Sequence, residues 1–232
     1  PGAEGGPARP RRARRDVVRT DRAHPYFGGP EEGHPHLLAL QELLTAFALA
    51  HPRLSYCQGM SDVAAPLLAV LDDEAQTYLC FCSLMRRLRP RFRPGGRGLA
   101  RAFAHLRRLL RRADPPFWAF LAARGAHDLL FCYRWLLLEL KREFAFEDAL
   151  RVLEVTWSSL PPGNPFLLFV CLAMLLEQRD AVMARAGDYN EVAMHFDRLV
   201  RRHHLPRVLR RAKALFAGYL EGWGGAPAAG PP

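Results

Sequence analysis

The sequence predicts an all-α protein, built as an irregular array of about eight to ten helices. Apolar residues recur every three or four positions from Leu37 to Leu220, and no stretch alternates apolar and polar residues as a half-buried strand does. Half of the 232 residues are hydrophobic, which is enough for one good core or for two small lobes that share one. We find no internal repeat, so a coiled coil and a solenoid are both excluded.

The individual helices follow from apolar stripes and from residues that start or stop helices. An apolar stripe from Leu37 to Phe47 predicts a helix over 36–51, which Pro52 ends. Asp114 is the expected N-cap of a helix whose first residue is Pro115. Further helices are predicted at 74–88, 97–112, 115–125, 127–144, 146–160, 166–185, 189–203 and about 206–220, with a chain break at 161–165.

Composition divides the chain into three parts. Residues 1–15 are rich in Gly, Pro and Arg, and we expect them to be disordered. The tail at 221–232 has a similar composition and carries the same expectation. The helical pattern therefore predicts one folded domain over residues 16–220.

Neither a membrane span nor a disulfide framework is predicted. The longest apolar run, Phe166 to Leu176, is well short of the roughly 20 residues that a span requires. The first 15 residues contain no apolar run, so we expect no signal peptide. The five cysteines lack CxxC spacing, and Cys80, Cys82 and Cys171 lie in strongly apolar helical patterns. We therefore expect free, reduced core thiols in a cytosolic protein.

The net charge of +10 leaves two interpretations open. Excess positive charge favours an anionic partner, namely nucleic acid, an acidic membrane face or an acidic protein surface. The bias towards arginine over lysine, together with many Ala, Pro and Gly residues, is equally consistent with codon composition.

The histidines and cysteines give only weak signals of a metal site or a cysteine nucleophile. The pair His34 and His36 lies in a Gly/Pro-rich loop, whereas His203 and His204 end a basic helix, where cations suit the helix dipole. We therefore predict no metal site. Cys57 has His51 nearby in sequence, but nothing marks that histidine as an oriented base for a cysteine nucleophile.

Two short stretches are more informative. In "RDVVRTDR", Asp16 and Arg19 are three residues apart, so one helical turn places them on one face, where they can pair. An arginine held in this way is suited to binding carboxylates and phosphates. In "SYCQGM", Gln58 stands between turn signals, and its amide can only donate and accept hydrogen bonds.

In this order and at these intervals, the segments "DVVRTDRAHPYF", "SYCQGMSDVAAPLL", "FCYRWLLLELKREF" and "VLEVTW" resemble the TBC (Tre-2/Bub2/Cdc16) domain of Rab GTPase-activating proteins. The resemblance covers about residues 15–220. One position departs from the family's IxxDxxR motif, because Arg15 or a neighbour replaces its apolar start. No Arg-x-x-x-Trp segment is present, so we expect a partial domain that lacks the N-terminal part. The residues that match the family's motifs are Asp16, Arg19, Thr20, Tyr56, Gln58, Gly59, Met60, Arg134, Trp135, Arg142, Glu143 and Phe144.

The resemblance implies a dual finger that completes the active site of a GTPase. Arg19 would stabilise charge on the transferring phosphoryl group, and Gln58 would orient the attacking water. Gly59 would let the loop approach the nucleotide closely. Asp16 would hold Arg19 and Tyr56 would brace the loop, with Thr20 and Arg134 as further supporting residues.

The implied partner is a Rab-family GTPase in its GTP-bound form, which would itself carry Mg²⁺ and GTP, so that this chain needs no cofactor. The resemblance also implies a cytoplasmic protein of membrane trafficking or autophagy, recruited to endomembranes such as vesicles or autophagosomes, where endomembrane-associated proteins are possible partners. A Rab-binding scaffold or effector with weak or no activity is the first alternative. A basic helical nucleic-acid-binding protein is the second, although it predicts basic stripes with interleaved aromatic residues, which the sequence lacks.

Overall fold

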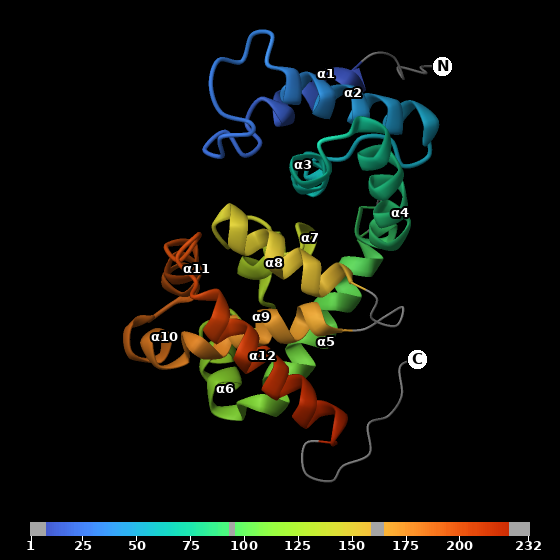
Figure 1. Ribbon diagram of the computed structural model, residues 1–232. Coiled ribbons are helices and arrows are strands. Elements are labelled where there is room, and N and C mark those ends of the chain that lie inside the picture. The colour runs from blue at the N-terminus through green and yellow to red at the C-terminus, as the bar shows by residue number, and fades with distance from the viewer. Residues whose placement is uncertain (1–7, 93–95, 159–164, 223–232) are drawn as a thin grey trace, which may run out of the picture. The chain divides into compact units, whose positions relative to one another are not determined.

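The computed structural model describes residues 8–92, 96–158 and 165–222, and these residues confirm the all-α class (Figure 1). They form twelve α-helices and one short 3₁₀ helix, with no strand in the described ranges. The chain divides into two compact units, residues 1–99 and residues 100–232.

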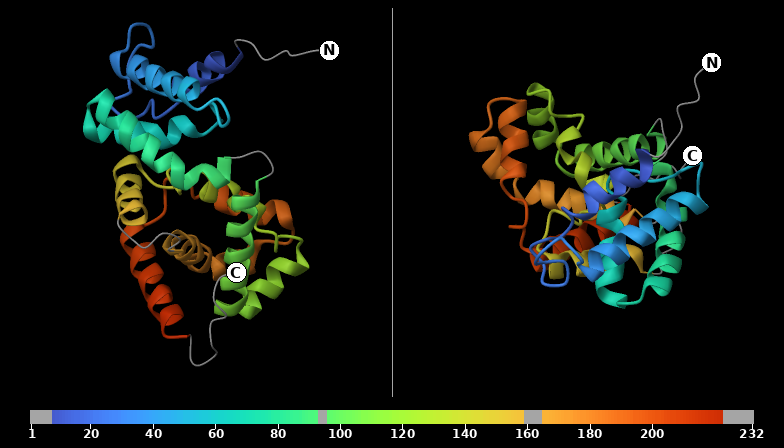
Figure 2. Two further views of the ribbon diagram at one scale, coloured as in Figure 1. Left: turned by 90° about the vertical axis from the view of Figure 1, so that its right-hand side faces the viewer. Right: turned by 90° about the horizontal axis from the view of Figure 1, so that it is seen from above.

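The first unit is a cluster of helices in which α1 packs on both α2 and α3, while α2, α3 and α4 contact one another. Figure 2 shows α1 and α2, in blue, lying alongside each other. The predicted stripe from Leu37 to Phe47 is confirmed as a buried face, and Phe27 and Phe81 are fully buried in the same unit. The helices are α1 (Ala8–Val17), α2 (Pro35–Ala50), α3 (Met60–Leu71) and α4 (Glu74–Phe92).

Helix α3 is absent from the predicted helices, and it contains Pro66, a residue that usually breaks helices. The structure keeps Pro66 inside α3, where it is buried with most of the helix. Tertiary burial of the apolar residues around Pro66 therefore outweighs the local preference of the sequence.

The second unit is built around α9, whose residues from Phe166 to Leu176 are all buried. Helix α12 packs along α9, and α7 and α10 also contact it (Figure 1). The elements are α5 (Arg97–Ala113), which begins at the end of the first unit, α6 (Pro115–Ala123), η1 (Leu130–Cys132), α7 (Tyr133–Leu137), α8 (Phe146–Trp157), α9 (Phe166–Glu177), α10 (Arg179–Arg185), α11 (Tyr189–Asp197) and α12 (Leu205–Leu220).

Two predicted helix starts are confirmed by their caps. The Asp114 side chain accepts a hydrogen bond from the backbone N–H of Phe117 at 2.9 Å, at the start of α6. The Asp73 side chain accepts one from the backbone N–H of Gln76 at 2.7 Å, just before α4 begins. Both caps satisfy backbone donors that the first helical turn leaves without a partner.

The long helix predicted over 127–144 is wrong. Only η1 and α7 form there, and the chain then turns, with Glu139 and Leu140 in the left-handed backbone region at φ 53° and 65°. The turn buries Glu139, Lys141 and Glu143. Buried charged groups are stable only with partners. Here Trp157 Nε1 donates to Glu139 Oε2 at 3.0 Å, and Arg134 Nε donates to Glu143 Oε1 at 2.6 Å.

Two other predicted helices end early. The helix predicted over 166–185 breaks at Gln178, and the new direction of α10 lets Arg179 Nε reach Asp114 Oδ2 at 2.6 Å. The helix predicted over 189–203 ends at Asp197, because the chain turns so that the backbone N–H of Arg201 donates to the carbonyl of Glu143 at 2.8 Å.

The predicted disordered segment over 1–15 overlaps α1, which begins at Ala8. Residues 1–7 lie outside the described residues, as do the predicted break at 161–165 apart from Pro165, and the tail beyond Gly222. Within the described ranges, no helix has the length and apolar character needed to cross a membrane.

Candidate functional site

Gln58 occupies the tip of a tight turn that leads into α3. The backbone N–H of Met60 donates to the carbonyl of Cys57 at 3.1 Å and closes the turn. Gly59 has φ 94° and ψ −11°, values that belong to the third position of a type II turn and favour glycine. Gly59 is buried, whereas the Gln58 side chain is exposed. The turn therefore presents an amide to solvent on a rigid backbone.

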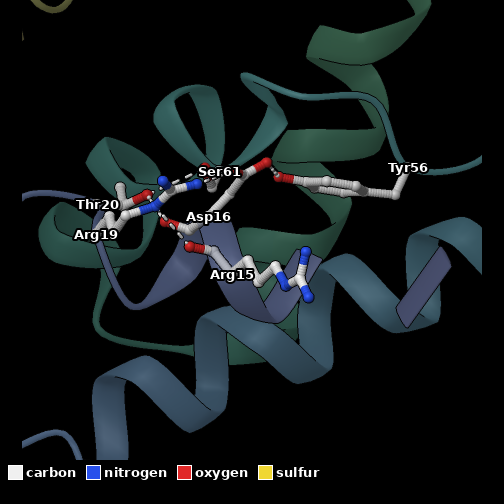
Figure 3. A network of polar contacts seen from close by, with 6 residues as sticks. All are labelled: Arg15, Asp16, Arg19, Thr20, Tyr56 and Ser61. Atoms are coloured by element: carbon white, nitrogen blue, oxygen red, sulfur yellow. Dashed lines mark hydrogen bonds and ion pairs between the residues drawn. The ribbon is translucent and has the colours of Figure 1, made fainter. Parts of the chain in front are cut away.

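Arg19 lies just beyond the C-terminus of α1, and two contacts orient its guanidinium (Figure 3). Its Nη2 pairs with Asp16 Oδ1 at 3.1 Å, which confirms the pairing that the spacing predicts. Its Nε donates to the carbonyl of Arg15 at 2.9 Å. The Arg19 side chain remains 71% exposed, whereas that of Asp16 is 15% exposed.

Asp16 also connects Arg19 to the segment that carries Gln58. The Tyr56 hydroxyl donates to Asp16 Oδ2 at 2.6 Å (Figure 3). One carboxylate oxygen of Asp16 therefore binds Arg19, and the other binds Tyr56. Burial raises the pKa of Tyr56 well above its usual value, and the hydrogen bond to Asp16 raises it further. The hydroxyl therefore stays protonated and remains a donor at neutral pH.

A second contact joins the same two segments. The hydroxyls of Thr20 and Ser61 are hydrogen-bonded at 3.0 Å, and Thr20 Oγ1 also lies 2.7 Å from the carbonyl of Asp16 (Figure 3). Thr20 and Ser61 are both buried. Ser61 is not among the predicted site residues, and its only signal in the sequence is its position directly after "YCQGM". Contacts across 40 and 41 residues thus hold the two motifs together.

Arg134 lies in the second unit and has a different environment. Its Nε and Nη2 donate to the two carboxylate oxygens of Glu143 at 2.6 and 3.2 Å, and Glu143 is fully buried. The hydrogen bonds to Glu143 raise the pKa of Arg134. Nη1 lies 3.5 Å from Asp197 Oδ1. Arg134 is therefore a partner for buried and surface carboxylates of its own unit.

The histidines contribute to packing. His36 stacks on Tyr26 with ring centroids 3.7 Å apart. His34 Nε2 is hydrogen-bonded to the carbonyl of Gly28 at 2.7 Å. His203 does not end a helix as predicted. It is buried in the loop that connects α11 to α12, and burial lowers its pKa to about 4. No cluster suited to a metal ion occurs among the described residues.

The cysteines are free, as predicted, but they are not all core residues. Cys80 is exposed, because it lies on the outer side of α4, whereas Cys132 and Cys171 are buried. Burial raises the pKa of Cys132 well above its usual value, which leaves an unreactive thiol. Cys57 Sγ lies 3.6 Å from the carbonyls of Leu54 and Phe92.

Comparison with known families decides the classification. The Rab-GTPase-TBC domain family matches residues 7–183, which include all of the segments that form the site. This chain belongs to the RabGAP-TBC family. The family resemblance that the sequence motifs indicate is thereby confirmed. The network around Asp16 lies within the residues that match the family of this RabGAP-TBC protein.

Two known proteins are similar in sequence to this RabGAP-TBC chain. It is 37% identical to mouse TBC1 domain family member 25 over 384 residues, covering 89% of this chain and 52% of that protein. It is 39% identical to mouse TBC1 domain family member 17 over 202 residues, covering 87% of this chain and 31% of that protein. The chain thus spans about half the length of the first relative and about a third of the second.

Solved structures share the fold. The crystal structure of the Ypt/Rab-GAP domain of Gyp1p superimposes with a TM-score of 0.75 at 20% identity, covering 95% of this chain and 77% of that one. The Chlamydomonas flagellar RabGAP TBC domain has a TM-score of 0.70 at 23% identity, covering 90% of this chain and 67% of that one. At these identities the likeness concerns the fold alone.

Proposed function

We propose that this chain accelerates GTP hydrolysis by a Rab-family GTPase and that Arg19 and Gln58 act as its two fingers. The observation that supports the proposal is the network on Asp16, which holds the Arg19 segment against the segment of Tyr56 and Gln58. Both finger side chains are exposed, while the residues that connect their segments are buried or half-buried.

Arg19 is suited to stabilising charge in the transition state of phosphoryl transfer. Its two described contacts use two of the five N–H donors of a guanidinium. Three donors remain for phosphate oxygens, on a side chain that Asp16 already orients. An arginine supplied in this way is worth about 10³- to 10⁵-fold in rate.

Gln58 is suited to orienting the attacking water. Its amide can accept a hydrogen bond from the water and donate one to a phosphoryl oxygen at the same time. Gly59 has no side chain at the buried third position of the turn, so the turn can approach a bound nucleotide closely. In this proposal the Rab contributes GTP and Mg²⁺, and its own glutamine is replaced by Gln58.

The proposal extends to cellular context by resemblance alone. A GTP-bound Rab would recruit the protein to endomembranes such as vesicles or autophagosomes, where endomembrane-associated proteins are further partners. An alternative is a Rab-binding scaffold with little activity. The observation that favours it is that the guanidinium of Arg19 is bonded back onto the end of its own helix, at Arg15 and Asp16.

The decisive experiment is single-turnover GTP hydrolysis by a panel of Rab proteins with this chain added. For each accelerated Rab, the assay is repeated with that Rab's own glutamine changed to alanine, using the wild-type chain and Gln58→Ala. We expect the wild-type chain to stimulate the glutamine-less Rab and Gln58→Ala to fail on it.

Arg14→Ala is a control, because Arg14 is an exposed arginine of α1 whose side chain makes no contact with Asp16. Binding of a GTP-loaded Rab without acceleration would establish the scaffold instead. Acceleration of the normal Rab combined with no stimulation of the glutamine-less Rab would remove Gln58 from the mechanism.

A further inference from the structure

A pocket in the first unit lies apart from the network on Asp16. Its volume is about 280 Å³, close to the lower end of the roughly 300–1,000 Å³ typical of small-molecule sites. It is formed by the end of α2, the loop at 51–54 and one face of α4. No residue of the Arg19 or Gln58 motifs lines it, so the proposed function does not account for it.

The interior of the pocket is apolar. Phe47 and Met85 form its base and are almost fully buried, with exposed fractions of 2% and 1%. The Phe47 ring is held between two others, stacked on His51 at 4.3 Å and edge-on to Phe81 at 4.9 Å between centroids. Such a base favours an apolar group of a ligand over water.

The rim of the pocket is strongly basic. Arg86 and Arg89 lie on the same face of α4 as Cys82 and Met85, at helical spacings of three and four, and Arg53 extends from the loop. All three arginines are exposed, and no ion pair joins any of them to a residue that the structure describes. No Asp or Glu is found among the described residues that line the pocket.

We propose that this pocket binds a small amphipathic anion, a single apolar chain or ring that carries a carboxylate or phosphate. The apolar part would rest on Phe47 and Met85, and the anionic head would bind the guanidinium groups at the rim. Arginine recognises both anions through paired N–H groups, so the two heads share one chemistry. Charge complementarity selects this ligand, because three arginines with no ion-pair partner among the described residues line one apolar cavity.

Three probe molecules separate the two halves of this recognition. Octanoate has both tail and head, octanol keeps the tail alone, and acetate keeps the head alone. We expect octanoate to bind one site saturably, measured by calorimetry, and to bind at least about tenfold more tightly than octanol or acetate. Octyl phosphate in the same titration shows which of the two anions the rim prefers.

Protein variants locate the binding. The triple variant of Arg53, Arg86 and Arg89 to alanine should bind octanoate at least about tenfold more weakly. The matched control replaces Arg101, Arg108 and Arg111, three exposed arginines of α5, by alanine and removes the same charge. The control should bind octanoate as the wild type does. Equal binding by all three proteins, or equal affinity for octanoate and octanol, would overturn the proposal.

The alkylation rate of Cys82 reports on binding in the pocket without any arginine variant. It lines the pocket and is half-buried, whereas Cys80 is exposed on the same helix. In a Cys80→Ala background, octanoate should slow alkylation of Cys82 several-fold, as measured by mass spectrometry, while octanol at the same concentration has little effect. Unchanged alkylation of Cys82 at saturating octanoate would also overturn the proposal.

Discussion

Two arginine–carboxylate pairs, one in each unit, use the same chemistry in different surroundings. Arg19 pairs with Asp16 at the end of α1 and stays 71% exposed. Arg134 pairs through two hydrogen bonds with Glu143, which is completely buried, and is itself 35% exposed. The comparison shows two roles for a carboxylate beside an arginine. It can orient the guanidinium towards solvent, or it can be a buried charge that the guanidinium neutralises. The exposed, oriented arginine is the one suited to a partner's phosphates.

The largest expected effect is on catalysis through the exposed pair. Arg19→Ala should reduce the stimulation of Rab GTP hydrolysis by about 10³-fold or more. Arg19→Lys should restore little, because an ammonium lacks the planar fork of the guanidinium. The free energy of unfolding should change by less than about 1 kcal/mol, since the Arg19 side chain is largely exposed. Single-turnover rates and thermal unfolding measure the two quantities, and an undiminished rate in Arg19→Ala would break the comparison.

The internal pair should show the opposite result. Arg134→Leu leaves the Glu143 carboxylate buried without its main partner, so we expect the free energy of unfolding to fall by about 3–4 kcal/mol. The double variant Arg134→Leu, Glu143→Leu should be less destabilised, because no unpaired charge remains. Urea unfolding of both variants measures this. A double variant that is less stable than the single one would contradict the interpretation.

A pH dependence should arise beside the internal pair. His203 packs against Trp135 and Phe144, which directly follow Arg134 and Glu143 in sequence, and burial lowers its folded pKa to about 4. Between that value and its usual pKa of about 6.5, the unfolded chain binds a proton that the folded chain does not. His203 should therefore remove about 3 kcal/mol of stability as the pH falls from about 6.5 to 4.

The test compares wild type with His203→Phe, which keeps an aromatic ring but cannot titrate. The difference in unfolding free energy between the two proteins should change with pH only in the window from about 4 to 6.5. A difference that stays constant across this range would show that His203 is solvated enough to keep an ordinary pKa.

The smallest expected effect concerns the support of the exposed pair. Tyr56→Phe removes the hydrogen bond to Asp16 but keeps the ring, so the unfolding free energy should fall by about 1–2 kcal/mol. Because Arg19 keeps its contact with the other oxygen of Asp16, the stimulated rate should fall much less than in Arg19→Ala. Tyr133→Phe, at an exposed tyrosine of the second unit, is the matched control. A rate loss as large as that of Arg19→Ala would give Tyr56 a direct part in hydrolysis.

The sequence predicts most of the residues that form the network on Asp16, but not the contacts that join its two segments. The spacing of Asp16 and Arg19 predicts their pairing, because one helical turn determines it locally. The bond from Tyr56 to Asp16 and the bond between Thr20 and Ser61 join residues 40 and 41 positions apart. No local pattern encodes such contacts, so Ser61 could be recognised only after α1 and α3 were brought together.

The sequence by itself determined the all-α class, the amphipathic helices such as α5 and the capped start of α6 at Asp114. These features depend on interactions within a few residues, namely apolar periodicity and the bonding of end groups. The tertiary structure alone decided that 127–144 turns rather than continuing as a helix, and that α3 includes Pro66. In both places, burying charges with partners or apolar surface outweighs local preference, because packing contributes more to helix stability than intrinsic propensity.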